Sequence, residues 1–298
     1  MQQLITFGLA GLIAQLVDGS LGMGYGVTST SLLVTTGTAA AVASASVHVA
    51  KLGTAVAGGA AHHRFGNVDW RAVRWLAAPG ALGAFLGAVA LSAAPVAGVG
   101  PFVALFLLGL GVYVIVRFRA GASVGEVVAR RPHQGRFFVV LGGGAGFLDA
   151  AGGGGWGPVG TSTLLAAGRM EPRQVIGTVS ASEFLVSLGA TAGFLIALPF
   201  ANLNFALIGA LLAGGLVAAP VAAWLTHHLD QRTLGTAIGV FIIATNLRTL
   251  AGALGADATT MAAASVVLAG VWLMMALHLA RAVKRGLRAR PIPETVSV

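Results

Sequence analysis

The sequence predicts an all-α polytopic membrane protein built from two inverted repeats. Each repeat is expected to hold one glycine-interrupted helix, as a re-entrant hairpin or a broken helix, followed by three transmembrane helices. One extra transmembrane helix is expected at the C-terminus. Three observations predict this fold class: an apolar composition with few charges, a series of apolar stretches of helix length, and an internal repeat that covers most of the chain.

The composition places the chain in a membrane. The 298 residues are 56% hydrophobic and 9% charged, and the mean hydropathy is +0.87. Because a soluble domain carries about 25% charged residues, we expect one membrane domain. A helix of about 20 apolar residues crosses the hydrocarbon core. The predicted full spans are residues 39–61, 74–92, 100–117, 173–198, 204–226, 233–251 and 259–280.

Two further apolar stretches, about 4–36 and 137–167, are each interrupted in the middle by glycines. The positive-inside rule places the basic segments 64–74 and 117–136 and the C-terminal tail in the cytoplasm. These assignments agree with one another if each interrupted stretch begins and ends on the same side, as a re-entrant hairpin does. The alternative is that each stretch crosses once, which gives parallel repeats and an external tail.

The internal repeat is clearest in the glycine-rich segments. Asp18–Gly26 matches Asp149–Gly157 at an offset of 149 − 18 = 131 residues, with an aspartate, three glycines and an aromatic residue in common. The match continues into the next helices and aligns Lys51 with Glu183. A Phe-x-Asn segment follows in each copy, and the predicted topology places one in the cytoplasm and the other outside. The repeats are therefore expected to be inverted, as in many secondary transporters.

Four parts are expected within this one membrane domain. They are a first repeat over residues 1–120, a cytoplasmic basic linker over 121–136, a second repeat over 137–252, and the extra transmembrane helix with a basic cytoplasmic tail over 253–298. The N-terminus lacks the basic lead of a signal peptide, so we expect it to stay in the mature protein.

The charges and the missing residue types exclude several classes of function. The net charge is +9, but the basic residues lie at span ends, where they orient the protein and meet membrane lipids, so no nucleic-acid partner is expected. The chain has no cysteine, no H-E-x-x-H motif and no serine–histidine–acid order. We therefore expect no enzyme, no metal site and no cofactor.

The two glycine segments form a candidate solute site. A dinucleotide-binding fold would need a preceding strand and a later acidic residue, and neither is present. The glycines could simply allow close helix packing. Alternatively, they form unwound tips whose free N–H groups bind an anion at a helix N-terminus, while the aromatic residues line the cavity or pack. The candidate substrate-binding residues here are Gly22, Gly24, Tyr25, Gly26, Gly153, Gly155, Trp156 and Gly157.

Charged side chains within the spans are the second candidate group. His48 and Lys51 lie three residues apart and share one helix face, and Glu183 is the repeat partner of Lys51. Lys51 and Glu183 could form a fixed ion pair, or Lys51 could hold an anion while Glu183 or His48 exchanges a proton. Further candidates are Ser180 and Ser182 as hydroxyl donors, and Asp18 and Asp149 as caps of the tips or as coupling groups.

The glycine tips and the segment His62–Trp70 resemble the sulfite exporter TauE/SafE family of membrane permeases. The resemblance covers nearly the whole chain. It implies secondary transport of sulfite and organosulfur anions such as sulfonates, in the bacterial inner membrane. Similar family members tend to carry an acidic residue where this chain has Lys51, and the change of charge sign bears on both substrate and coupling.

Three functional hypotheses follow. The first is a secondary transporter of small sulfur-containing or organic anions, with alternating access at the repeat interface and coupling to a proton or another ion. The second is a cation or neutral-solute permease that uses Asp18, Asp149 and Glu183. The third is a role without transport. The expected partners are a small anionic solute and membrane lipids, and the sequence also allows a homo-oligomer.

Overall fold

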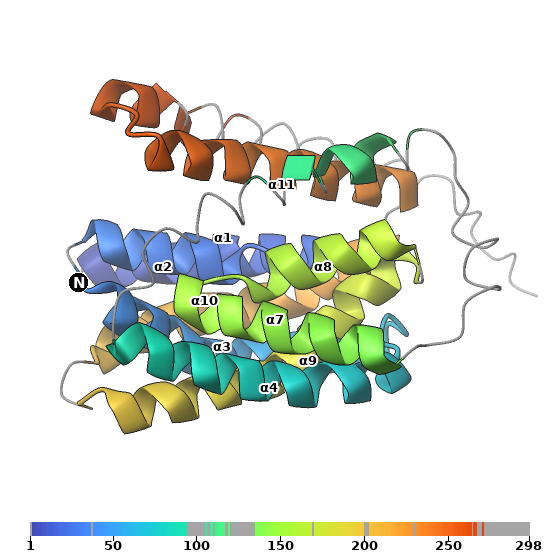
Figure 1. Ribbon diagram of the computed structural model, residues 1–298, viewed down its shortest axis with the longest axis horizontal. Coiled ribbons are helices and arrows are strands. Elements are labelled where there is room, and N and C mark those ends of the chain that lie inside the picture. The colour runs from blue at the N-terminus through green and yellow to red at the C-terminus, as the bar shows by residue number, and fades with distance from the viewer. Residues whose placement is uncertain are drawn as a thin grey trace, which may run out of the picture.

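The computed structural model describes residues 2–36, 38–93, 105, 108–109, 111–116, 119, 135–168, 170–199, 203–228, 231–263, 265–266 and 270. Within these ranges the regular structure is helical, without strands, which confirms the predicted all-α class (Figure 1). The predicted spans 100–117 and 259–280 are only partly described. Nearly all of the predicted linker and the basic tail beyond residue 270 lie outside the described residues.

Five of the predicted spans correspond to helices. They are α3 (Ala40–Arg64), α4 (Trp70–Ala93), α9 (Pro172–Ala197), α10 (Phe205–His228) and α11 (Gln231–Ala253). Four of these, together with α1 (Gln2–Leu21), are long and apolar enough to cross a membrane, and α11 falls short because its apolar part covers only residues 236–252. The chain is thus a multi-pass membrane protein.

Each glycine-interrupted stretch forms two helices of unequal length. The first consists of α1 and α2 (Tyr25–Thr35), and the second of α7 (Gly135–Gly152) and α8 (Trp156–Ala167). The interruption lies near the middle of each stretch, as predicted, and the helix before it is the longer one; α1 alone has 20 residues. The breaks contain glycines with positive φ, Gly22 at 75° and Gly153 at 73°. Side chains rarely adopt that conformation, so glycine is what permits these sharp turns.

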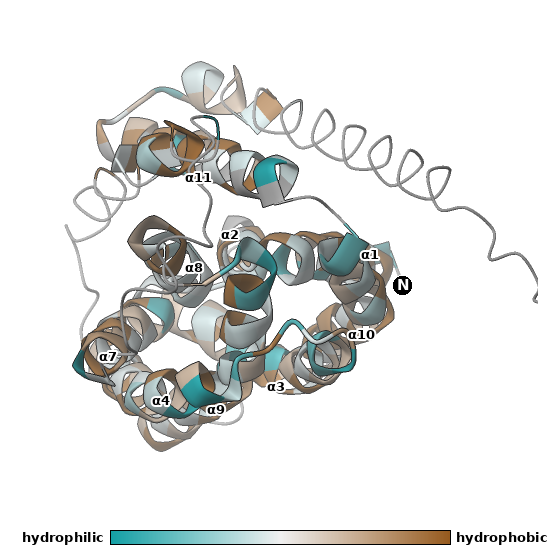
Figure 2. Ribbon diagram, turned by 90° about the vertical axis from the view of Figure 1, so that its right-hand side faces the viewer, coloured by the Kyte–Doolittle hydropathy of each residue, from teal (hydrophilic) through white to brown (hydrophobic). Residues whose placement is uncertain are grey.

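Six long helices form an arc in the order α7, α4, α9, α3, α10 and α1, and α2 and α8 lie on its inner side (Figure 2). Each neighbouring pair in this order is in contact. Helix α11 lies at the edge of the body in Figure 1 and touches α9, α8 and α1. It also packs against residues 111–116, where Gly111 and Gly239 each face a partner isoleucine. The arc and its two inner helices therefore form the body of the molecule that positions the site.

Contacts between individual residues give the helix directions. Gly11 and Gly19 of α1 face Leu211 and Ala222 of α10, so α1 and α10 run in parallel. The imidazole of His62, at the end of α3, reaches the carbonyl of Gly19, so α3 runs the same way.

On the other side of the arc, Gly83 and Gly87 of α4 face Gly143 and Phe147 of α7, and Gly189 of α9 faces Ala81. Helices α4, α7 and α9 thus share one direction. It is opposite to that of α3, because Lys51 pairs with Glu183 while the earlier residue His48 meets the later Phe194. Since α1 and α3 are parallel, the chain must return between them through α2, and it returns through α8 between α7 and α9.

Basic residues gather at one end of the arc, which we call the basic end. It carries Arg64, Arg71, Arg74, Arg136 and Arg173 from four separate segments, and it faces the viewer in Figure 2. At the opposite ends of these six helices, none of the described residues is Lys or Arg. This is the asymmetry that the positive-inside rule expects of a membrane protein.

Small residues let the helices touch backbone to backbone. A Cβ atom on Gly146 of α7 would collide with the carbonyl group of Gly80 in α4. The neighbouring Gly144 has no atom within 4 Å of its Cβ position. Close packing between small residues is a main source of helix association in lipid, because the hydrophobic effect does not drive helices together there.

We expect Gly146→Ala to push α7 away from α4 and to lower the thermal unfolding midpoint in detergent. Overpacking of this kind costs about 1–3 kcal/mol. Gly144→Ala is the matched control and should leave the midpoint unchanged or slightly raised, because alanine favours the helix. Equal midpoints for the two variants would contradict the backbone contact between α4 and α7.

Candidate functional site

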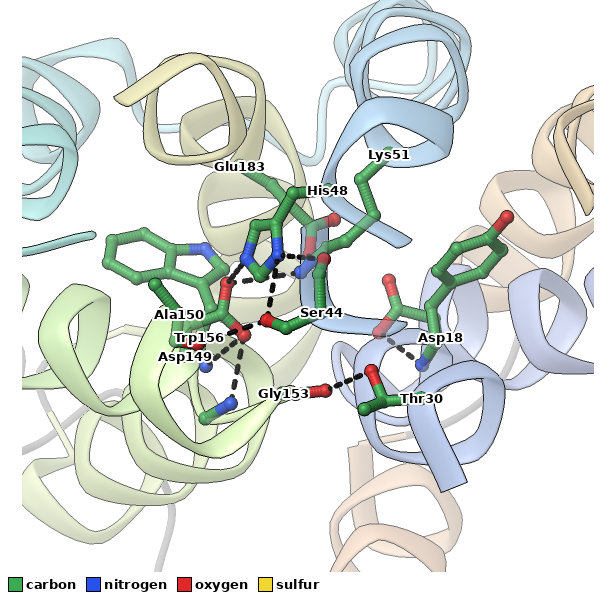
Figure 3. Close-up of polar contacts among 12 residues, drawn as sticks. Asp18, Thr30, Ser44, His48, Lys51, Asp149, Ala150, Gly153, Trp156 and Glu183 are labelled. Atoms are coloured by element: carbon green, nitrogen blue, oxygen red, sulfur yellow. Dashed lines mark hydrogen bonds and ion pairs between the residues drawn. The ribbon is translucent and has the colours of Figure 1, made fainter. Parts of the chain in front are cut away.

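A set of buried charged groups lies where α3, α7 and α9 meet (Figure 3). The ammonium Nζ of Lys51 is 2.7 Å from Oε1 of Glu183 and 3.2 Å from Oδ2 of Asp149. All three residues are at most 5% exposed. Burying an ion is costly unless it is paired and hydrogen-bonded, so Lys51 depends on both carboxylates. The three side chains come from both halves of the chain.

His48 extends this set. Its Nδ1 lies 2.8 Å from the carbonyl oxygen of Ser44, and its Nε2 lies 3.0 Å from Oδ2 of Asp149. Asp149 therefore has two basic neighbours, His48 and Lys51.

The two tip aspartates cap the helices that follow them. Oδ1 of Asp149 accepts the amide protons of Gly155 at 2.8 Å and Trp156 at 3.0 Å, and Oδ1 of Asp18 accepts that of Tyr25 at 3.2 Å. These amides belong to the tips in which the sequence predicted free N–H groups that bind an anion. In the structure they already donate to an aspartate. Capping of the helix N-terminus makes each aspartate tolerable at this depth.

The two tips hold each other through a reciprocal pair of hydrogen bonds. The hydroxyl of Thr30 in α2 donates to the carbonyl oxygen of Gly153 in the second tip at 2.7 Å. The hydroxyl of Thr161 in α8 donates to the carbonyl oxygen of Gly22 in the first tip at 2.6 Å. Both donors and both acceptors are partners in the repeat. The tips therefore converge at one place.

Glycine is required where the tips touch. A Cβ atom at Gly26 would collide with Gly154, and one at Gly157 would collide with Gly22 and Met23. The same fit leaves no room for a side chain at Gly26 or Gly157. The glycines thus serve close packing as well as chain reversal.

The aromatic residues of the tips pack rather than face open space. Tyr25 and Trp156 are fully buried. The hydroxyl of Tyr25 donates to the carbonyl of Leu211 in α10, and the indole N–H of Trp156 donates to the carbonyl of Val179 in α9. Each ring therefore anchors its tip to a long helix.

The remaining predicted site residues have different surroundings. Ser182 donates to the carbonyl of Thr178 in its own helix. Ser180 is buried and its hydroxyl has no partner among the described residues. Asp18 acts electrostatically on Glu183 and Lys51 and is the tip carboxylate without a basic partner in Figure 3. The described residues hold no cluster of three His, Cys, Asp or Glu that could bind a metal ion.

His62 has a structural role that sequence reasoning missed. The side chain is fully buried. Its Nε2 donates to the carbonyl of Gly19 at 2.9 Å, and its Nδ1 accepts from Asn67 at 3.2 Å. It therefore fixes the end of α1 near the basic end. The available signal was the helical spacing that places His48, Lys51 and His62 on one face of α3.

Comparison with known proteins identifies the family. The family described as Sulfite exporter TauE/SafE matches residues 7–249. The chain belongs to the TauE/SafE family. It is also 46% identical over 277 residues to the "Probable membrane transporter protein YtnM" of Bacillus subtilis (strain 168), which covers 93% of this chain and 92% of that protein. No solved structure matches the chain.

Membership of TauE/SafE agrees with the resemblance found at the glycine tips and at His62–Trp70. Together with the apolar helices, it makes the protein a multi-pass membrane transporter, consistent with a bacterial inner membrane. The buried set around Lys51 therefore lies inside a transporter.

We expect Lys51→Met to destabilise the protein strongly, because it leaves Asp149 and Glu183 close together without their shared ammonium. Breaking a buried ion pair costs about 3–5 kcal/mol. Combining it with Glu183→Gln should recover part of the loss. The measurement is the free energy of unfolding by denaturant titration in mixed micelles.

The matched control for Lys51→Met is the half-exposed pair Glu171–Arg173, whose Oε2 and Nε atoms are 2.9 Å apart. Glu171→Gln should cost about 1 kcal/mol or less, as exposed pairs do. If Lys51→Met cost no more than Glu171→Gln, the ion set would not support the fold.

Proposed function

We propose that the protein is a secondary transporter of small sulfur-containing or organic anions, of the sulfite or sulfonate kind, coupled to a proton or another ion. The observation that carries the proposal is the buried group of Lys51, His48, Asp149 and Glu183 at the meeting point of the two halves. Ionisable residues inside a membrane domain are rare and usually line a substrate or ion path.

The charges of this group suggest how an anion and a proton are linked. Three carboxylates, on Asp18, Asp149 and Glu183, face two basic side chains, Lys51 and His48. While both of its carboxylate partners are ionised, they neutralise the ammonium charge of Lys51, so that it does not attract an anion. Protonation of Glu183 or Asp149 would release the ammonium. In this proposal a proton and an anion bind together.

Alternating access would follow from two inverted halves. In support, α1 and α3 run one way and their repeat partners α7 and α9 run the other way. The reciprocal bonds Thr30–Gly153 and Thr161–Gly22 relate the tips in the same manner. In this proposal, rocking of one half against the other would open the ion set to each side of the membrane in turn.

The second candidate is a permease for a cation or a neutral solute. The excess of carboxylates over basic groups favours it, and Asp18 in particular has no cationic partner among the described residues. Its ligands would be Asp18, Asp149 and Glu183, with Lys51 as a fixed counter-charge. The sign of the charge that crosses the membrane separates the two candidates.

The test is electrical. The protein is reconstituted in liposomes on a solid support, and currents are recorded on jumps of sulfite, sulfoacetate, taurine and simple cations. We expect an anion-dependent current that falls at least about tenfold in Lys51→Ala, which corresponds to about 1.4 kcal/mol of lost interaction. A pH-sensitive dye inside the liposomes should report that the luminal pH falls when the anion enters. This fall is expected in the wild type and not in Glu183→Gln.

Glu171→Gln serves as the control and should keep the full current, because Glu171 is far from the ion set in an exposed pair. A current with a cation that is lost in Glu183→Gln, and none with any anion, would replace the first candidate by the second. Absence of any current and of any change in luminal pH, with the protein folded, would contradict the first candidate and the cation form of the second.

A further inference from the structure

One face of α9 carries buried hydroxyl groups that have no hydrogen-bond partner. Ser180, Ser187 and Thr191 are 4%, 0% and 7% exposed, and among the described residues none of their hydroxyls has a partner. A buried hydroxyl in a helix commonly donates to the carbonyl four residues back, as Ser182 does. Leaving a hydroxyl unpaired in the membrane interior costs free energy, so three such groups on one helix need an explanation.

These hydroxyls lie along a single line. Spacings of seven and four residues place Ser180, Ser187 and Thr191 on one helix face. Glu183 occupies the same face between the first two, where it meets Lys51 at 2.7 Å. Phe194, three residues beyond Thr191, continues the line. The face therefore connects the ion set to the end of α9 that lies away from the basic end.

A pocket opens at that end of the line. It lies between the first half of α3 and the last turns of α9, and its lining includes Ala45, Val49, Thr191, Phe194 and Leu198. Thr191 thus lines the pocket, and its hydroxyl is buried beside it. Ser187 lies one turn deeper and Glu183 two turns deeper.

Phe194 both lines the pocket and contacts His48 of the ion set. Its ring centroid is 5.9 Å from that of His48, and the side chain is only 1% exposed. His48 in turn contacts Asp149. A solute that enters the pocket would meet the Phe194 ring before it could reach either His48 or Lys51. An apolar ring at a constriction is a common means of closing a path.

We propose that this face of α9 is the solute path from the pocket to the Lys51–Glu183 pair, with Phe194 as its gate. This proposal rests on the proposed function and adds the route and the groups that line it. The hydroxyls of Thr191 and Ser187 donate to the oxygen atoms of an oxyanion that passes from turn to turn, and Ser180 lies one turn beyond the pair. At the end of the path the ammonium of Lys51 receives the anion.

The path can be tested by cysteine accessibility, because the chain has no native cysteine. Thr191→Cys, Ser187→Cys and the control Leu188→Cys are made in the full-length protein and reconstituted in liposomes. Leu188 is next to Ser187 but 46% exposed on the outer surface of the arc, where lipid is expected. The probe is a methanethiosulfonate reagent that carries a sulfonate, present on both sides of the membrane.

Thr191→Cys should react at least about tenfold faster than Leu188→Cys, because only a thiol in contact with water forms the reactive thiolate. Ser187→Cys should react slowly, and adding Phe194→Ala should accelerate it about tenfold by opening the constriction. In variants that conduct sulfite, modification at either position should block the sulfite current. Phe194→Ala should not accelerate Leu188→Cys.

Two outcomes would overturn the path. One is equal reactivity of Thr191→Cys, Ser187→Cys and Leu188→Cys in the Phe194→Ala background. The other is a sulfite current that persists unchanged after Thr191→Cys is fully modified. Labelling needs no transport, so fast labelling in a protein without any anion current would support the path while contradicting the proposed function.

Discussion

The ammonium group of Lys51 is the constraint around which the structure is arranged. It lies inside a membrane domain, and its two acceptors, Asp149 and Glu183, belong to α7 and α9 while Lys51 belongs to α3. Pairing it therefore requires both halves of the chain to meet at one point. Asp149 also contacts His48 and caps α8, so the tip, the ion set and the start of the short helix share a single carboxyl group.

The two copies of the repeat differ in the charges that they contribute to the ion set. Asp18 and Asp149 occupy matching places in the repeat and both cap their own tips, but among the described residues only Asp149 has basic partners. The alignment of Lys51 with Glu183 and of His48 with Ser180 explains the difference, since basic groups in one copy stand opposite acidic or neutral groups in the other. The two copies of the repeat thus place side chains of different charge at their shared centre.

The sequence predicted the membrane fold because long apolar stretches and clustered charges have few other solutions, and α3, α4, α9 and α10 lie within a few residues of the predicted spans. It also selected Lys51 and Glu183 as partners through the repeat. It also named capping of the tips as one of two roles for Asp18 and Asp149. It could not indicate that Asp149 completes the ion set or that His62 fixes the end of α1. Those facts depend on distances between segments more than a hundred residues apart or on the side-chain direction, and neither is encoded in local pattern.

The reciprocal threonine bonds have a consequence for how the chain is made. The partner of Thr30 lies 123 residues later in the chain, and the partner of Gly22 lies 139 residues later. During synthesis neither bond can form until its later partner has left the ribosome, when more than half of the chain has been made. The contact between the two tips is therefore a late step of membrane insertion.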